Sequence, residues 1–238
     1  YIDGAAGYLN YGININPGGT TTPKSMSIQG NTVKDFSFHG ISVNDRAYEV
    51  SVINNKVRTS YGVGVAVGIL IQAANGQYGA TQIVANNHVN GGFIGIYATG
   101  NYSFSINSNR VRDQVGTNSR GIMISDCDYW TLQGNTTDNA GEIAIYVVGS
   151  AAGYCRRGSV VGNIMLTGIK GLYIYGNAAN GVQHISVVAN QAFGFSGNGI
   201  LANANTDRIT HGENIALGNG TNISFLGTNT VANTNIST

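Results

Sequence analysis

Apolar and polar residues recur along this chain in one frame: an apolar residue, two further residues, an asparagine, one residue and a second apolar residue. The frame occurs eight times, at Asn31, Asn55, Asn87, Asn109, Asn135, Asn163, Asn190 and, in a degraded copy, Asn214. In that last copy His211 stands where the earlier copies have an aliphatic residue. Successive asparagines are 22 to 32 residues apart, a period typical of the coils of a solenoid.

A second signal, usually a glycine followed by alternating apolar positions, comes about ten residues after each asparagine, as in 68–71, 95–98 and 121–124. Short runs of period two bounded by Gly and Asn are typical of β-strands, and two or three such strands a coil build a parallel β-helix. A propeller blade needs roughly 40 residues or more, and a leucine-rich repeat would show its own leucine frame. We therefore predict an all-β fold, a right-handed parallel β-helix of about eight coils. In the copy at 143–145, we assign the glycine position to Glu142.

The asparagine of each frame has a physical role at a corner of the coil. Asparagine tolerates left-handed backbone angles, and its side-chain amide can bond the equivalent amides of the coils above and below. We expect these residues to form a ladder that stabilises the stack rather than to bind a ligand.

The outward positions of the two predicted sets of strands differ in polarity. Before the asparagines they read Ser27, Ser51, Ile83, Ser105, Thr131, Ser159, Ser186 and Thr210, which predicts a solvated sheet. In the second set they read Ser42, Leu70, Tyr97, Met123, Ala144, Tyr173 and Leu201, with Tyr146 and Tyr175 one alternation further on. A contiguous apolar and aromatic stripe favours a subunit interface over cover by a loop or a platform for sugar rings.

Composition narrows the classes of partner. Charged residues make up 10% of the chain against an average of roughly a quarter, and the formal net charge is +1, with Lys and Arg scattered along the sequence. This pattern argues against nucleic acid and acidic membranes as partners. No apolar run approaches about 18 residues, so no membrane insertion is expected. Two cysteines and four dispersed histidines predict no metal site, and nothing indicates a cofactor.

The whole chain, residues 1–238, is interpreted as one domain. We expect an entry segment at 1–24, repeat coils at 25–226 and a final partial coil or tail at 227–238. The sequence begins with Tyr1 and shows no amphipathic helix to cover an end of the solenoid, so we expect a fragment of a longer protein.

The two cysteines occupy equivalent places in the repeat. Cys127 and Cys155 each lie eight residues before a frame asparagine, which predicts that they stack on adjacent coils. Adjacent coils are about 4.8 Å apart, within the range that a disulfide requires. A disulfide bond and a pair of buried thiols both fit this spacing.

Few carboxylates are available for chemistry, since the chain has only eleven. Asp113 and Asp138 follow frame asparagines at one turn of the coil, and Glu142 comes next on the same flank. Two carboxylates about 5 to 10 Å apart can hydrolyse a glycosidic bond, one as the acid and the other as base or nucleophile. We therefore take Glu142, Asp138 and Asp113 as candidate catalytic residues, with Glu142 first because it breaks the repeat pattern.

Basic side chains on this flank are candidates for substrate binding: Arg120, Arg112, His39 and Arg58. We expect Arg120 to neighbour Glu142 along the stack, and coil alignment places His39 level with Arg120. An arginine there would bind a carboxylate of the substrate or hold a neighbouring acid ionised. The alternative is a solvated turn in which opposite charges on adjacent coils pair.

A second pair of carboxylates, Asp126 and Asp128, flanks Cys127 on a different turn. Tyr129 and Trp130 follow directly, which makes this pair the runner-up for a site. Trp130 is the only tryptophan of the chain and fits the core equally well.

The asparagine-marked coils and the Gly-Ile strand frame, with copies from about residue 26 to 225, resemble the pectate-lyase-like β-helix superfamily. Within it, the uncharged coils rich in Gly, Ser and Asn are similar to the β-helix of bacteriophage tailspike proteins. The resemblance implies a homotrimer, in the virion tail or extracellular, that binds and depolymerises a bacterial surface polysaccharide as a glycoside hydrolase or polysaccharide lyase. The alternative is a non-catalytic tail fibre or adhesin module that binds surface glycan or serves as a spacer.

Overall fold

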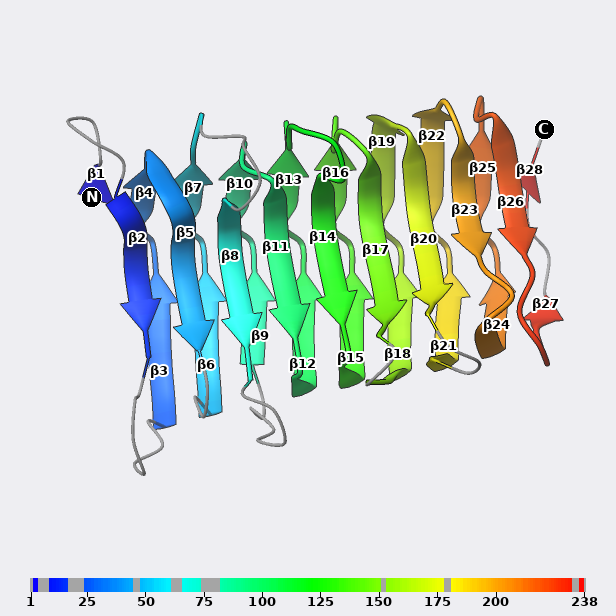
Figure 1. The fold of residues 1–238 in the computed structure, drawn as a ribbon, viewed down its shortest axis with the longest axis horizontal. Helices are drawn as coiled ribbons and strands as arrows, with labels where there is room; N and C mark the ends of the chain where they lie inside the picture. Colours follow the sequence, from blue (N-terminus) through cyan, green and yellow to red (C-terminus); the bar gives the residue numbers. More distant parts are fainter. Residues whose placement is uncertain are drawn as a thin grey trace.

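The computed structural model describes residues 2–3, 9–16, 24–44, 48–60, 66–73, 82–150, 153–177, 181–232 and 236–237. These residues form β-strands joined by turns, and the strands pair in parallel into three long sheets. Figure 1 shows the strands stacked along the long axis, with the two chain termini at opposite ends. The prediction of a parallel β-helix is confirmed. In the described part of the chain, no helix is long and apolar enough to cross a membrane.

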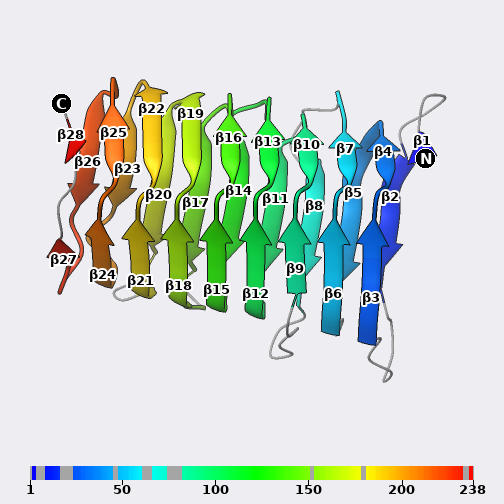
Figure 2. The same cartoon turned by 180° about the vertical axis from the view of Figure 1, so that it is seen from behind.

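Each full coil contributes one strand to each sheet. Sheet C contains β3 (Lys24–Gln29), β6 (Tyr48–Ile53), β9 (Gln82–Ala85), β12 (Tyr102–Asn107), β15 (Asp128–Gln133), β18 (Cys155–Val161), β21 (Val182–Val188), β24 (Thr206–Gly212) and β27 (Val231–Ala232). Sheet A contains β1 (Ile2–Asp3), β4 (Thr32–Lys34), β7 (Lys56–Arg58), β10 (His88–Asn90), β13 (Arg110–Arg112), β16 (Thr136–Asp138), β19 (Ile164–Gly168), β22 (Gln191–Phe195), β25 (Ile215–Leu217) and β28 (Ile236–Ser237). Sheet B contains β2 (Leu9–Ile15), β5 (Phe36–Asn44), β8 (Val67–Gln72), β11 (Ile94–Thr99), β14 (Arg120–Ser125), β17 (Ile143–Gly149), β20 (Lys170–Gly176), β23 (Asn198–Ala202) and β26 (Thr221–Phe225). Figure 2 shows sheet A continuing in the direction of sheet C, with sheet B behind them.

The eight frame asparagines form the predicted ladder at the corner between sheets C and A. In each of its seven steps, Nδ2 of one asparagine donates a hydrogen bond to Oδ1 of the next at 2.9 to 3.0 Å. The backbone N–H of the same residue donates to that oxygen as well, at 2.9 to 3.1 Å. From Asn55 to Asn214 these side chains are buried. Their polar atoms are therefore bonded within the stack.

The left-handed backbone at this corner belongs to the residue before each asparagine, so our assignment of it to the asparagine was wrong. These preceding residues, with φ between 50° and 70°, are Gly30, Asn54, Asn86, Ser108, Gly134, Gly162, Ala189 and Glu213. The chain turns one residue early because the asparagine must direct both its N–H and its amide along the stack. The turn residue points away from the core and varies freely in side chain.

The repeat glycines lie where sheet B begins, and close packing rather than an unusual backbone angle requires them. A Cβ on Gly95 would lie 2.2 Å from a methyl carbon of Val111 and 2.6 Å from the carbonyl oxygen of Gly121. In the copy at 143–145, the strand register aligns Ala144 with this glycine position, because Arg120 pairs with Ile143. Our assignment of Glu142 to the glycine position was therefore wrong. Glu142 lies in the turn just before β17.

The core runs along the whole solenoid and consists mainly of aliphatic side chains. Trp130 is part of it, with 2% of its surface exposed. A Cβ on Gly158, its partner in the next strand, would lie 2.1 Å from the indole, so this glycine makes room for the ring. On the outside of sheet C, the predicted hydroxyl stripe is in register from Ser27 to Thr210.

The stack of coils continues beyond the predicted repeat, residues 25–226, at both ends. The degraded copy at Asn214 still completes the ladder, and His211 lies in the core stacked on Phe225, with ring centroids 3.8 Å apart. Strands also occur within the predicted entry and tail segments, where β2 pairs with β5 and β27 with β24. A buried imidazole thus replaces the aliphatic residue without ending the coil.

Cys127 and Cys155 stack on adjacent coils as predicted, and both are free thiols with no exposed surface. Burial raises the pKa of Cys155 to about 12 and raises that of Cys127 well above its ordinary value. We expect neither thiol to react with Ellman's reagent in the native protein and both to react once urea has unfolded it. Rapid modification of either cysteine in the folded protein would contradict this account.

Candidate functional site

Three neighbouring strands of sheet B begin with the groups that form the candidate site. Arg120 opens β14, Lys170 opens β20, and both pair with Ile143 at the start of β17. Glu142 lies immediately before Ile143 in the turn that leads out of sheet A. The fold thereby places one carboxylate between two cations on adjacent coils.

Glu142 and Arg120 are in contact, as predicted. Arg120 Nη1 lies 3.7 Å from Glu142 Oε2, and the backbone N–H of Asn118 donates to the same oxygen at 2.7 Å. The side chains are 12% and 20% exposed, respectively, so the pair is largely shielded from water. Among the described residues, no group donates a hydrogen bond to Glu142 Oε1. One carboxylate oxygen is thus held in place, and the other is available to a ligand.

An aromatic ladder lies beside this pair on the outer face of sheet B. The rings of Tyr146 and Tyr173 stack with centroids 5.6 Å apart and an angle of 26°, and Tyr175 lies 5.6 Å from Tyr173. The guanidinium of Arg120 lies 5.0 Å above the Tyr146 ring, and the ammonium of Lys170 lies 4.7 Å above the Tyr173 ring. These groups together, Arg120, Glu142, Tyr146, Lys170 and Tyr173, are called the Glu142 site below.

Electrostatics in the Glu142 site follow from its partial burial. Burial lowers the pKa of Arg120, while the negative charge of Glu142 acts in the opposite direction. Burial also raises the pKa of Tyr146 to about 12. At neutral pH the phenol of Tyr146 is therefore protonated and can donate a hydrogen bond.

Asp138 is the last residue of β16, whereas Asp113 lies one residue beyond the end of the adjacent strand β13. In the strand register of sheet A, Asp138 lies beside Arg112. The closest described hydrogen-bond partner of its carboxylate is the hydroxyl of Thr167, at 3.5 Å. Asp113 accepts hydrogen bonds from Arg112 Nε at 2.8 Å, Asn90 Nδ2 at 3.0 Å and Asn139 Nδ2 at 3.2 Å. Neither carboxylate has a contact with Glu142.

The hydrogen bonds of Asp113 determine its charge. Burial acts to raise its pKa, but the hydrogen bonds from Asn139 and Arg112, with the charge of Arg112, outweigh burial and lower the pKa below its ordinary value. Asp113 therefore stays ionised at neutral pH and cannot serve as a proton donor there.

His39 is level with Arg120 in sheet B, as predicted, but β8 and β11 lie between them. Three coils at about 4.8 Å each separate the two residues by roughly 14 Å. His39 instead packs against Phe38 and Tyr11, with ring centroids 4.3 and 5.3 Å away. Burial lowers its pKa to about 4, so the imidazole is neutral at pH 7. It does not join the Glu142 site.

Arg58 and Arg112 lie on the outer face of sheet A, in one row that also contains Lys34, Asn90 and Asp138. This row is separated from sheet B by the turn that follows each short strand. Of the four predicted binding residues, Arg120 alone therefore contacts Glu142, while Arg58 and Arg112 belong to another surface.

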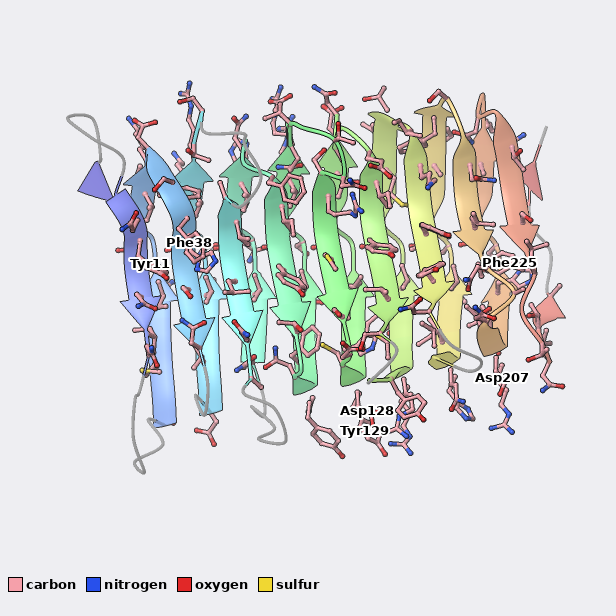
Figure 3. The ribbon with its side chains drawn as sticks, viewed as in Figure 1. Tyr11, Phe38, Asp128, Tyr129, Asp207 and Phe225 are labelled. Carbon is pink, nitrogen blue, oxygen red and sulfur yellow. The ribbon has the colours of Figure 1, made fainter. Side chains whose placement is uncertain are left out.

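The runner-up carboxylates lie at the opposite edge, where sheet B leads into sheet C. Asp128 Oδ2 accepts hydrogen bonds from Arg156 at 3.0 Å and Arg157 at 2.9 Å, and Arg157 lies 4.6 Å above the Tyr129 ring. Figure 3 shows Asp128 and Tyr129 at this edge, away from the start of sheet B. Only 10% of the Asp128 side chain is exposed: Oδ2 is held by two cations, and Oδ1 is buried with no hydrogen-bond partner among the described residues. In this cluster, Asp128 forms ion pairs with two arginines at a corner of the coil, which is a structural role.

Tyr146 and Lys170 were not predicted as part of the site from the sequence. Tyr146, rather than Ala144, continues the outward row from Met123 to Tyr173. Aligning Ala144 with the repeat glycines would have revealed this, since Tyr146 then follows at the same distance as Met123 follows Gly121. No group of three or more His, Cys, Asp or Glu side chains suited to a metal ion occurs in the described part of the chain.

Comparison with known proteins supports the fold of the chain. No protein-family model matches the sequence, and no curated protein matches it. The catalytic domain of a GH87 alpha-1,3-glucanase in complex with tetrasaccharides is similar in structure, with a TM-score of 0.63, 14% identity and coverage of 88% of this chain and 49% of that one. The full-length tailspike protein 2 of an Escherichia coli bacteriophage, CAB120, gives 0.62 and 14% over 96% of this chain and 35% of that one.

A further tailspike protein, named Dettilon, has a TM-score of 0.53 and 12% identity over 91% of this chain and 55% of that one. Our chain thus spans between about a third and just over half of the length of these proteins. At such low identity the similarity shows a shared parallel β-helix fold. The predicted resemblance to tailspike β-helices is confirmed at that level.

Proposed function

We propose that this chain is the β-helix of a depolymerase that binds and cleaves a bacterial surface polysaccharide at the Glu142 site. The observation that carries the proposal is a carboxylate with one available oxygen, held by Arg120 beside stacked tyrosines on the outside of the solenoid. The similar folds of a glucanase bound to tetrasaccharides and of two tailspike proteins are consistent with it.

The tyrosines supply the surface on which a sugar would bind. Aromatic rings offer an apolar face to the C–H face of a sugar ring, while their hydroxyl groups bond polar substituents. Tyr146 and Tyr173 are stacked on successive coils, and Tyr146 lies under Arg120, the partner of Glu142. A glycan chain bound along the two rings would bring its glycosidic bonds toward the carboxylate. Lys170 and Arg120 then bind oxygen atoms at either side.

In the proposed reaction, Glu142 protonates the glycosidic oxygen as that bond breaks. A second carboxylate activates water or attacks the anomeric carbon, and Asp138, beyond the turn at 139–141, is our candidate. Asp113 stays ionised and suits a supporting role through Arg112 rather than that of the acid. A lyase is the alternative reaction, in which a base removes a proton beside a carboxylate of the sugar.

Turnover of a panel of purified capsules and lipopolysaccharides tests the proposed function. We expect the protein to release new reducing ends from at least one of them, or products that absorb in the ultraviolet if the reaction is a lyase elimination. Binding to a glycan of the panel without cleavage would instead support a non-catalytic tail fibre or adhesin module. If no glycan of the panel is bound or cut, the proposal is rejected.

The outer face of sheet B also bears on assembly. Leu70, Tyr97 and Met123 extend the aromatic row toward the N-terminus, and Val67, Leu70 and Ile94 form a second apolar cluster there. We propose that the parent protein is a homotrimer, located in a virion tail or outside the cell, in which part of this face is covered by a neighbouring subunit. Light scattering should give three times the mass of one chain, and a monomeric mass would contradict the assembly.

A further inference from the structure

The short strands of sheet A gather the basic residues that the sequence scatters. On β4, β7, β10 and β13 the central residue is a buried valine, and the two flanking residues point outward. These eight outward positions hold Thr32, Lys34, Lys56, Arg58, His88, Asn90, Arg110 and Arg112. Lys and Arg make up 12 of the 238 residues, yet they occupy five of these eight positions. Cations that are scattered along the sequence therefore lie together in space, on the flank to which Arg58 and Arg112 were assigned.

The strand register arranges these cations in two straight rows. One row contains Lys56, His88 and Arg110, and the other contains Lys34, Arg58 and Arg112 with Asn90 between the arginines. Neighbouring coils are about 4.8 Å apart, so positive groups repeat along the stack at that interval or twice that interval. A groove of about 570 Å³ is lined by Lys34, Lys56, Arg58, His88 and Arg112 of these rows. We call this surface the sheet A groove.

Cations outnumber carboxylates along the sheet A groove. Asp113, which is bonded to Arg112, is the carboxylate that lines it. Asp35 directly follows Lys34, and Asp3 and Asp138 are the register partners of Lys34 and Arg112 at the two ends of one row. Lys56, Arg58 and Arg110 form no ion pair with any residue that the structure describes. The pKa of His88 is consistent with this excess of positive charge. Burial, and then the charges of Arg110, Arg112 and Lys56, lower that pKa below its ordinary value. A groove lined by one sign of charge attracts a ligand of the opposite sign.

We propose that the sheet A groove binds a linear polysaccharide that carries carboxylates, with the glycan laid along the stack of coils. This inference rests on the proposed function for its glycan partner and adds the charge of that partner. An extended glycan suits the straight rows because its sugar units follow one another at an interval similar to that of the coils. Asp138 takes the next position in the row and marks the C-terminal limit of the cationic stretch.

The side chains of the sheet A groove distinguish an acidic glycan from a nucleic acid. Proteins that bind single-stranded nucleic acid combine a cationic groove with aromatic rings on which bases stack. The eight outward positions on β4, β7, β10 and β13 contain no Phe, Tyr or Trp. Duplex DNA carries a charge about every 1.7 Å along its axis, much denser than rows spaced by one coil. The observations therefore favour the glycan.

Binding of defined probes by calorimetry tests the proposal. We expect an alginate oligosaccharide to bind, while a maltooligosaccharide of the same length does not. Raising NaCl from about 0.01 M to about 1 M shortens the screening length from about 30 Å to about 3 Å and should abolish binding. Equal binding of the neutral probe, or tighter binding of an oligothymidylate of the same charge than of alginate, would overturn the proposal.

Substitutions at outward positions locate the binding surface without disturbing the core. Replacing Lys56 and Arg58 together by Gln should weaken alginate binding about ten-fold. Arg208→Gln is the matched control, because Arg208 is an exposed arginine on the outer face of sheet C. Its affinity should equal that of the wild type. If the double substitution binds as the wild type does while both variants melt normally, the glycan does not occupy the sheet A groove.

His88 provides a direct probe of the groove. A bound polyanion stabilises the protonated imidazole, so its pKa, measured by NMR, should rise when alginate is added. By linkage, affinity should increase as pH falls from about 7.5 to about 5.5, where carboxylates with a pKa of about 3.5 remain ionised. His88→Gln should remove this pH dependence. An unchanged His88 pKa in the complex would contradict the placement of the glycan.

These experiments can reject the binding proposal and the cleavage proposal independently of each other. If alginate binds and no polysaccharide is cut by the protein, the glycan site in the sheet A groove is supported and the proposed depolymerase activity is rejected. If a neutral polysaccharide is cut and alginate is not bound, the depolymerase activity is supported and the acidic glycan is rejected as the ligand of the groove.

Discussion

Replacing Asn109 by alanine should lower the free energy of unfolding by about 3 to 5 kcal/mol. Asn109 Nδ2 donates to the Val84 carbonyl at 2.8 Å and to Asn135 Oδ1 at 3.0 Å, and its own Oδ1 accepts two hydrogen bonds from Asn87. Its removal leaves polar groups of two other coils buried without that partner, each costing about 1 to 3 kcal/mol. Urea unfolding followed by circular dichroism measures the change.

Ser105→Ala is the matched control for the ladder. Ser105 lies on the same coil, in β12, but its side chain points outward and is partly exposed. We expect its effect to stay within about 0.5 kcal/mol. If Asn109→Ala is as mild as this control, the asparagine ladder does not stabilise the solenoid.

Glu142→Gln should lower kcat on the cleaved polysaccharide by about 100- to 10,000-fold, because it removes the proton that the leaving oxygen requires. KM should change little, since the amide keeps the size of the carboxylate and the tyrosine surface is untouched. Asp138→Asn should reduce kcat as well if Asp138 is the second carboxylate. Steady-state assays of reducing ends measure both variants.

Glu213→Gln makes the same chemical change at an exposed turn on a distant coil and should retain wild-type kcat. If Glu142→Gln and Asp138→Asn both cleave at the wild-type rate, the Glu142 site is not the catalytic centre. A loss of kcat in Glu213→Gln equal to that in Glu142→Gln would point to a general effect of charge removal.

The fold was predictable because its determinant repeats. Each coil needs an asparagine whose amide bonds the next asparagine, and a position that must repeat to bond its own copy is visible in the sequence. The hydroxyl stripe of sheet C was predictable for the same reason, since alternation about the asparagine places Ser105 and Thr131 outward in register. The exact turn residue was not, because glycine, asparagine, serine, alanine and glutamate all adopt the left-handed angles there.

The candidate site was predicted only in part because its register depends on turns of variable length. Contact between Arg120 and Glu142 was predicted correctly even though the alignment that suggested it was two residues off. The error hid Tyr146, and with it the aromatic surface beside the carboxylate. Turn lengths do not follow from the apolar frame, since many turns join the same two strands equally well.

The charge of the sheet A groove was predicted only in part, because Arg58 and Arg112 were assigned to one flank but Lys56 and Arg110 were not. Lys56 and Arg110 are 54 residues apart in sequence, yet one strand alone, β10, lies between theirs. A net charge of +1 describes the whole molecule and carries no information about such a gathering. In a solenoid, charge has to be counted along the coils rather than along the chain.

A crystal structure of the Glu142→Gln protein with an oligosaccharide of the cleaved polysaccharide tests the central claim most directly. We predict sugar rings packed on Tyr146 and Tyr173, with a glycosidic oxygen about 2.6 to 3.2 Å from the side chain at position 142. An oligosaccharide bound instead at the Asp128 corner or on the outer face of sheet C, with the tyrosines bare, would contradict the account.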